Sequence, residues 1–329
     1  MAKVLNGAII PNLPWEEAPK DYEMPIWRYS KNPIMKRNPF PNIDRIFNSA
    51  LVPWKDGFIG VFRCDRLDGI PQLFLGHSRT GTDIEIEKEP IHFLSFDGAP
   101  LPDRVWGYDP RLVKIGDDYV VVWCDELGNA PTIGIAKTND FVHFYKYDAP
   151  FIPANRNGVL FPRKINGRYY MLSRPSDCGH TPFGDIYISE SKDLEYWGKH
   201  RLLLKRDFNC WSGLKIGGGP APIETDEGWL TLIHGVQNSC NGFVYAAGVI
   251  LLDKEDPTKV LAVCKDPILL PTEPYEMVGF TSNVVFPTSI LTDGETGRMA
   301  IYYGCADTCT SICFTTVDRL LSYLKAHRM

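Results

Sequence analysis

The chain has 329 residues, with 35 Lys plus Arg against 40 Asp plus Glu and a formal net charge of −5. A mildly acidic chain lacks the basic stripe expected of a protein that binds nucleic acid or an anionic membrane. No stretch approaches the about 18 consecutive apolar residues of a transmembrane helix, and residues 1–19 lack the apolar core of a secretory signal. We therefore expect a soluble, cytoplasmic protein with no nucleic-acid or membrane partner.

The first segment differs in composition from the rest of the chain. Residues 1–46 are rich in Pro, Lys, Arg and Asn and show no regular hydrophobic period. This composition predicts an extended arm that wraps the surface or a neighbouring subunit. We expect residues 47–329 to form a single domain.

One strand pattern occurs five times after the arm. A turn signal of Gly, Asp or Asn precedes a run of β-branched and aromatic residues, which is typical of the second strand of a β-hairpin. A strand-like partner precedes each of these runs. The five second strands are expected at 56–63, 117–124, 167–174, 227–234 and 297–304, and their partners at 48–54, 109–115, 158–165, 220–225 and 283–291.

A third strand-like run follows each hairpin and often closes on a Ser/Thr/Lys-x-Asp turn. These runs span 72–83, 132–140, 185–193, 245–256 and 310–318. The units recur at intervals of roughly 50 to 70 residues. Five such units of three or four antiparallel strands predict an all-β fold, a five-bladed β-propeller. The alternative is one β-sandwich or a pair of them, which would not need a regular long period.

The C-terminal part carries a cysteine pattern and a helical pattern. Cys305, Cys309 and Cys313 recur at every fourth position of a strand-like run, which puts them on one face of a sheet as small buried hydrophobes. A metal site is the alternative, and we expect no metal and no cofactor. Residues 317–327 place leucines on one face, which predicts a short amphipathic helix.

The predicted topology indicates where a functional site would lie. In an antiparallel hairpin, the start of the first strand and the end of the second meet at the same open end. The inner strands of a propeller line its channel, so these ends should ring one mouth of the channel. The polar residues at these ends are Asn48, Ser49, Arg63, Asp109, Arg111, Asp125, Arg156, Asn157, Arg174, Lys215, His234, Tyr245, Asn283 and Asp307.

The charges in this ring favour a small anionic ligand. Arginines recur at equivalent strand ends of several units, and an arginine fork suits phosphate or carboxylate. Among the carboxylates, Asp109 has the most constrained context. Pro110 restricts the backbone after it, and Arg111 follows on the same strand face.

Several segments resemble one enzyme family. Residues 107–113, 155–177, 211–236, 279–289 and 302–308 are similar to glycoside hydrolase family 130, which comprises inverting β-mannoside phosphorylases and hydrolytic relatives with a five-bladed propeller. The likeness runs from about residue 30 to the C-terminus. Relatives often have Glu before the catalytic Asp, where this chain has Tyr108, so the lining of the site should differ there.

The resemblance implies roles for most residues of the ring. Asp109 would be the general acid, acting indirectly by protonating the 3-hydroxyl of the mannosyl unit, whose own proton passes to the glycosidic oxygen. The implied phosphate-binding residues are Arg156, Arg174, Lys215, His234 and Tyr245, and the implied sugar-binding residues are Asn48, Ser49, Arg63, Asn283 and Asp307. Arg111 and Asp125 receive no role.

One acid beside a cationic cluster is what phosphorolysis needs. An inverting hydrolase requires a second carboxylate to activate water, whereas inorganic phosphate is already an anionic nucleophile. We therefore expect a phosphorylase that releases α-D-mannose 1-phosphate from β-1,4-mannooligosaccharides, with phosphate as co-substrate and a homo-oligomeric assembly. The alternatives are a mannosylglucose phosphorylase, a β-mannoside hydrolase and a glycan-binding propeller without turnover.

Overall fold

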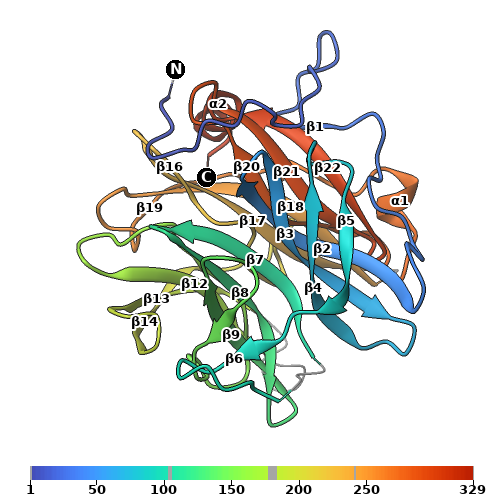
Figure 1. The fold of residues 1–329 in the computed structure, drawn as a ribbon. Coiled ribbons are helices and arrows are strands. Elements are labelled where there is room, and N and C mark those ends of the chain that lie inside the picture. The colour runs from blue at the N-terminus through green and yellow to red at the C-terminus, as the bar shows by residue number, and fades with distance from the viewer. Residues whose placement is uncertain (1, 103–105, 177–183, 241, 329) are drawn as a thin grey trace.

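The computed structural model describes residues 2–102, 106–176, 184–240 and 242–328. Five antiparallel sheets follow one another along the chain and surround a common axis (Figure 1). The chain is therefore a five-bladed β-propeller, as its repeats predicted. No helix in the described part of the chain is long and apolar enough to cross a membrane.

The first three blades each begin with the strand nearest the axis. Blade one consists of β2 (Ile43–Trp54), β3 (Gly57–Arg66), β4 (Pro71–Ser78) and β5 (Glu85–Pro90). Blade two consists of β7 (Tyr108–Ile115), β8 (Asp118–Leu127), β9 (Ala130–Thr138) and β10 (Phe144–Lys146), and β6 (Phe93–Leu94) pairs in parallel with β10. Blade three consists of β11 (Asn155–Leu160), β12 (Tyr169–Pro175), β13 (Ile186–Ser191) and β14 (Trp197–Leu204).

The last two blades show where the repeat is irregular. Blade four contains β15 (Lys215–Gly218), β16 (Ile223–Thr225), β17 (Gly228–Ser239), β18 (Gly242–Leu252) and β19 (Val260–Val263). Its predicted inner strand at 220–225 is shorter than expected, because Pro220 and Pro222 lack the N–H that a ladder needs and separate β15 from β16. Blade five contains β20 (Val285–Thr292), β21 (Arg298–Cys305) and β22 (Cys309–Thr316).

The N-terminal arm completes blade five. Its short strand β1 (Trp27–Arg28) pairs antiparallel with β22, so the blade contains strands from both ends of the chain. Arg28 Nε lies 2.7 Å from Glu276 Oε1, and the fully buried Glu276 also accepts a hydrogen bond from the Tyr303 hydroxyl at 2.9 Å. Glu276 belongs to the short helix α1 (Pro274–Met277). This buried ion pair therefore fastens the arm to the blade that closes the ring.

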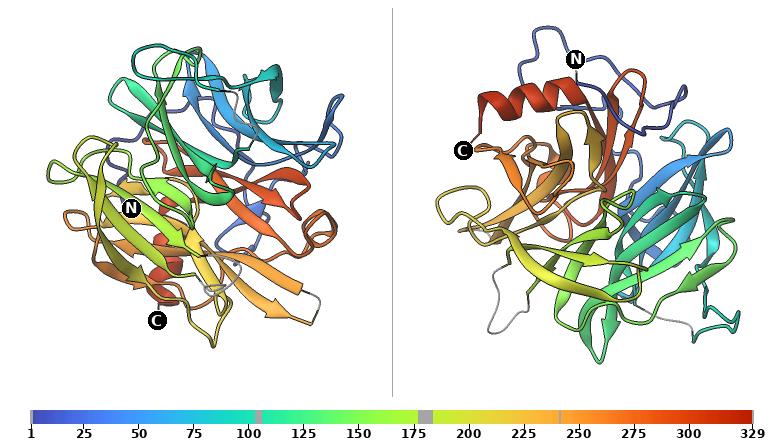
Figure 2. Two further views of the ribbon diagram at one scale, coloured as in Figure 1. Left: turned by 90° about the horizontal axis from the view of Figure 1, so that it is seen from below. Right: turned by 90° about the vertical axis from the view of Figure 1, so that its left-hand side faces the viewer.

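The C-terminal helix α2 (Val317–Ala326) packs on its own domain. Thr316 caps its first turn by accepting a hydrogen bond from the Arg319 backbone N–H. Leu320, Leu321 and Leu324 are buried against blades four and five, which confirms the amphipathic helix that the sequence predicted. In Figure 2 the helix lies beside the N-terminal arm.

The three regularly spaced cysteines are buried as expected. Cys305 ends β21 directly opposite Cys309 on β22, and Cys313 lies four residues further along β22. All three are part of the hydrophobic core that blades three, four and five share. Another cysteine, Cys178, lies outside the described residues.

Candidate active site

Three of the five inner strands carry the same irregularity at their open ends. The hydrogen-bonded register shifts within residues 47–50, 108–111 and 156–159. One residue inside each shift has a left-handed backbone: Asn48 (φ +48°), Asp109 (φ +51°) and Asn157 (φ +56°). Asn and Asp adopt this conformation more readily than other residues with a side chain, and a bulge re-aims the side chain it carries. The fold therefore turns equivalent polar side chains of three blades toward the axis.

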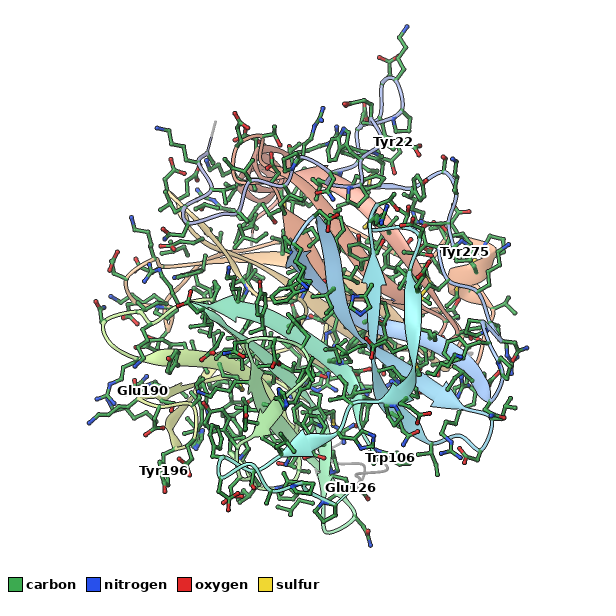
Figure 3. All side chains as sticks on the ribbon, in the orientation of Figure 1. Tyr22, Trp106, Glu126, Glu190, Tyr196 and Tyr275 are labelled. Atoms are coloured by element: carbon green, nitrogen blue, oxygen red, sulfur yellow. The ribbon has the colours of Figure 1, made fainter. Side chains whose placement is uncertain are left out.

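These strand ends gather on one side of the molecule. Trp106 and Glu126, which flank them in the sequence, project on the side away from Tyr22 of the N-terminal arm (Figure 3). The open end of blade two therefore lies on the side of the molecule away from Tyr22.

Asp109 is held by residues of blade one. Its Oδ1 accepts a hydrogen bond from Asn48 Nδ2 at 2.8 Å and one from Arg63 Nη1 at 2.9 Å, and the side chain is almost fully buried. Arg63 is oriented in turn by Asp65, which accepts from Arg63 Nε at 2.8 Å and from Nη2 at 3.2 Å. Burial opposes the charge of Arg63, but the carboxylates of Asp109 and Asp65 outweigh it and raise the Arg63 pKa. Tyr108 lines the same place, with its ring centroid 5.1 Å from Arg63 Cζ.

A second carboxylate approaches from blade five. Asp307 lies in the turn between β21 and β22 with φ +47°. Burial raises the pKa of Asp307 above its ordinary value, Arg63 opposes this shift, and the charge of Asp109 adds to it. The structure therefore brings Asp307, Arg63 and Asp109 from three blades into one electrostatic neighbourhood.

The other two predicted sugar-binding residues are held mainly by backbone contacts. The Ser49 hydroxyl donates to the Phe47 carbonyl at 3.3 Å within its own bulge. The Asn283 carbonyl accepts from the Tyr245 backbone N–H at 2.9 Å, and Asn283 has φ +60°. Asn283 thus links the loop before β20 to blade four, next to a predicted phosphate-binding residue.

The predicted phosphate-binding arginines lie directly opposite each other on β11 and β12. Arg174 is almost fully buried, and its Nη1 donates to His234 Nε2 at 2.9 Å. When the Asn157 side-chain amide is turned so that its oxygen faces Arg174, this oxygen accepts hydrogen bonds from Arg174 Nη1 at 2.9 Å and from Nη2 at 3.3 Å. Burial, together with the charge of Arg156, lowers the Arg174 pKa to about 10. Neither arginine forms a salt bridge within the described residues, and the Nε atoms of both lack a hydrogen-bond partner there.

His234 is neutral and supports Arg174. Its Nδ1 lies 3.2 Å from the Gly218 carbonyl, so Nδ1 carries the proton and Nε2 accepts from Arg174. Burial lowers the His234 pKa far below its ordinary value, and the charges of Arg174, Arg111 and Lys215 lower it further. The His234 side chain is fully buried, so it acts here through Arg174.

Lys215 and Tyr245 complete the cationic side of the mouth. Lys215 Nζ lies 5.7 Å from the Tyr245 ring centroid, and the Tyr245 ring stacks near His234 with 6.5 Å between centroids. Burial raises the Tyr245 pKa, which keeps the phenol protonated. All five residues of the predicted phosphate site therefore lie on blades three and four.

Two residues of the predicted ring occupy other surroundings. Asp125 pairs with Lys146 Nζ at 3.1 Å, and both side chains are buried within blade two. The buried Arg111 donates to three backbone carbonyls. Sequence reasoning gave no role to Asn157 or Asp65. Asn157 was in the predicted ring without a role, and the pattern of Asx followed by a small or constrained residue, as in Asn48-Ser49 and Asp109-Pro110, recurs at 157–158.

The donor set suits an oxyanion better than a metal ion. Guanidinium and ammonium groups donate hydrogen bonds and do not ligate cations. Among the described residues, no group of three or more His, Cys, Asp or Glu side chains is arranged to hold a metal. The arrangement offers the carboxylates of Asp109 and Asp307 around Arg63, and a cationic cluster on the side of blades three and four.

Comparisons with known proteins agree with this geometry. A family model described as beta-1,4-mannooligosaccharide phosphorylase matches residues 8–326. A beta-1,4-mannooligosaccharide phosphorylase of Ruminococcus albus is 49% identical over 330 residues, covering 99% of this chain and 98% of the relative. A beta-1,2-mannobiose phosphorylase of Listeria innocua is 39% identical, covering 79% of this chain and 70% of the relative. The solved structure of a Listeria innocua beta-1,2-mannobiose phosphorylase with beta-1,2-mannobiose superposes with a TM-score of 0.82 at 26% identity, covering 92% of this chain and 100% of that one.

Proposed function

Because the chain belongs to glycoside hydrolase family 130, we propose that it is an inverting β-1,4-mannooligosaccharide phosphorylase. It transfers the non-reducing-end mannosyl unit to inorganic phosphate, releases α-D-mannose 1-phosphate and also runs in reverse. The preference for β-1,4-linked substrate follows the Ruminococcus albus relative, which is 49% identical over nearly the whole chain.

The observation that carries this proposal is the pair of arginines, Arg156 and Arg174, that form no ion pair with a described carboxylate. Arg174 is buried, and among the residues that the structure describes its Nε, like that of Arg156, has no hydrogen-bond acceptor. An unpaired buried charge is expensive, so such a group is retained where a ligand supplies the opposite charge. Phosphate provides several acceptor oxygens and roughly one to two negative charges near neutral pH, which match the forks of two arginines.

Asp109 acts as the general acid in the proposed mechanism. Its Oδ1 is occupied by Asn48 and Arg63, which leaves Oδ2 to carry the transferable proton. Phosphate attacks the anomeric carbon from the face opposite the leaving group, so the C1–O bond breaks as the new C1–O bond forms. Asp109 protonates the mannosyl 3-hydroxyl, and the proton of that hydroxyl passes to the departing glycosidic oxygen. The configuration inverts from β to α.

The remaining residues divide between the two substrates. Asn48, Ser49, Arg63, Asn283 and Asp307 are assigned to the mannosyl unit, and Arg156, Arg174, Lys215 and Tyr245 to phosphate. The neutral His234 is assigned to phosphate binding through Arg174, because the Arg174 guanidinium occupies its Nε2. A hydrolytic mechanism is less well supported, because it has no use for the cationic cluster of Arg156, Arg174 and Lys215. Of the carboxylates near Asp109, Asp65 is engaged by Arg63 and Arg45, and Asp307 is assigned to the mannosyl unit.

A product analysis with and without phosphate separates the alternatives. Mannobiose and mannotriose are incubated with the protein, and the products are resolved by chromatography. Phosphate-dependent formation of mannose 1-phosphate supports the proposal. Free mannose without phosphate indicates a hydrolase, and no product indicates a glycan-binding propeller. Mannosylglucose, tested in parallel, reports on the reducing-end residue that is preferred.

The cellular setting proposed for this enzyme is the cytoplasm. Inorganic phosphate is abundant there, and a charged sugar phosphate is retained by the membrane. We also expect a homo-oligomer, in line with the resemblance described above, and light scattering after size-exclusion chromatography measures its stoichiometry.

A further inference from the structure

Arg111 is a buried arginine that faces backbone carbonyls instead of a carboxylate. It lies on β7 and is almost fully buried. Its Nη1 donates to the Asp109 carbonyl at 2.7 Å, its Nε to the Gly219 carbonyl at 3.2 Å and its Nη2 to the Gly218 carbonyl at 3.3 Å. The side chain therefore spans from the strand of the proposed acid to the inner strand of blade four.

The first of these contacts supports the unusual backbone of Asp109. The register of β7 shifts between Tyr108 and Arg111, so the two residues between them are not paired with β8. A residue inside such a bulge loses its partner in the strand ladder. The Asp109 carbonyl therefore accepts from Arg111 instead, while Asp109 itself is left-handed with φ +51°. Removing this donor takes away the side-chain hydrogen bond that the carbonyl of the proposed acid residue accepts.

The other two contacts reach the phosphate side of the site. The Gly218 carbonyl that accepts from Arg111 also accepts from His234 Nδ1 at 3.2 Å. This contact fixes the tautomer whose Nε2 accepts from Arg174. The neighbouring Gly217 admits this approach, because a Cβ there would lie 2.5 Å from His234 Cε1. The Arg111 guanidinium therefore contacts both the Asp109 carbonyl and the Gly218 carbonyl. The Gly218 carbonyl in turn orients His234, which accepts from Arg174.

We propose that Arg111 is a positioning residue that sets the proposed acid, Asp109, relative to the phosphate-binding arginine, Arg174, through Gly218 and His234. This inference rests on the proposed phosphorolysis. The acid and the attacking phosphate must act on opposite faces of one mannosyl unit, so their separation matters as much as their individual positions. A misplacement of about 1 Å costs on the order of 100-fold in rate.

Substitutions can separate two contributions of Arg111, its positive charge and its hydrogen bonds to the three carbonyls. Arg111→Met keeps most of the side-chain volume and removes both the charge and the hydrogen bonds. Arg111→Lys keeps the charge, but a single Nζ cannot contact the carbonyls of Asp109, Gly218 and Gly219 together. Arg319→Met is the matched control. Arg319 lies on helix α2 and also donates to backbone carbonyls, those of Tyr22 and Met24.

The test measures kcat, the KM for phosphate and the KM for mannobiose for each variant, with the melting temperature as a check of folding. We expect Arg111→Met to lower kcat roughly 100-fold and to raise the phosphate KM about tenfold, with little change in the mannobiose KM. Arg111→Lys should restore the phosphate KM without restoring kcat. Arg319→Met should change only the melting temperature.

A double-mutant cycle with Arg174→Lys tests the coupling itself. If Arg111 acts through His234 and Arg174, the combined loss in kcat/KM is smaller than the product of the two single losses. Multiplicative losses overturn the proposal. So do kinetic constants within about twofold of wild type in folded Arg111→Met, or in Arg111→Lys if the methionine variant does not fold. Absence of phosphate-dependent turnover in the wild type, measured alongside, overturns the proposed function instead.

Discussion

Replacing Arg174 by methionine removes the most deeply buried cation of the proposed phosphate site at nearly constant volume. The Nη atoms of the buried guanidinium contact His234 and Asn157, and its Nε has no hydrogen-bond partner among the described residues. A charge-assisted hydrogen bond contributes about 1.5–3 kcal/mol, so two such bonds to phosphate are worth about 3–4 kcal/mol after allowance for the open mouth. At about 1.4 kcal/mol per tenfold, the KM for phosphate should rise by a factor of about 100 to 1,000.

The same substitution should make the protein without phosphate more stable. A buried charge without a counter-ion destabilises the native state, so methionine at position 174 should raise the melting temperature in phosphate-free buffer. Added phosphate stabilises the wild type by binding only its native state, and this rise should disappear in the variant. A gain in stability together with a loss of phosphate binding distinguishes a ligand-binding arginine from a structural one.

Steady-state kinetics with mannobiose at varied phosphate concentration test this prediction. The KM for mannobiose should change by less than about threefold. Arg201→Met on the outer strand of the same blade is the matched control. Arg201 is exposed, and its contact with a carboxylate is long, 3.5 Å from Nη1 to Glu190 Oε2. A phosphate KM within twofold of wild type, or a larger change in the mannobiose KM than in the phosphate KM, would refute the reasoning.

Three further predictions concern the acid, the buried histidine and the closure of the ring. Asp109→Asn keeps the acceptor for Asn48 and Arg63 but cannot donate the proton, so kcat should fall at least about 1,000-fold with the fold intact; substantial residual release of mannose 1-phosphate would contradict this. The pKa of His234 is lowered mainly by burial, so below about pH 6.5 His234 gains a proton in the unfolded chain but not in the folded one. The free energy of unfolding should therefore decrease by up to about 1.4 kcal/mol for each unit by which the pH falls. In urea unfolding between about pH 5 and 7, the free energy of unfolding of His234→Gln should depend less steeply on pH than that of the wild type. The same slope in both proteins would contradict this prediction. Arg28→Met leaves the buried Glu276 without its cation, which should destabilise the protein by about 3–5 kcal/mol with phosphate KM unchanged; Glu276→Gln in the same chain should recover part of the loss, and a melting temperature equal to wild type would refute this assignment.

The blades were predictable because each repeats the same local chemistry. Turn residues followed by β-branched and aromatic runs located all five hairpins, and the third strands followed in order. The strand β1 was not predictable, because two residues within a Pro-rich arm carry no strand period. Its pairing with β22 depends on contacts across nearly 290 positions, as from Trp27 to Phe314.

The positions of the candidate site residues were predictable, but their contacts were not. Strand-end geometry placed Asp109, Arg63 and Arg174 at one mouth, and the structure brings them there from different blades. The bulges that turn Asn48 and Asp109 toward the axis depend on backbone registers that no side-chain pattern specifies.

Two residues of equal prominence in the sequence proved to have different environments. Asp125 is neutralised by Lys146, which comes from another strand of the same blade. Arg111 donates to backbone carbonyls, because the bulge before it and the glycines at the end of β15 bring backbone within reach of its side chain. In both cases the partner is set by the packing of strands that lie apart in the sequence.

The most direct test of the central claim is a time course of mannotriose cleavage with phosphate, followed by phosphorus and proton NMR. The account predicts that inorganic phosphate disappears one for one with the appearance of α-mannose 1-phosphate, and that Asp109→Asn stops both. Release of free mannose without consumption of phosphate, or β-mannose 1-phosphate as the first product, would contradict it.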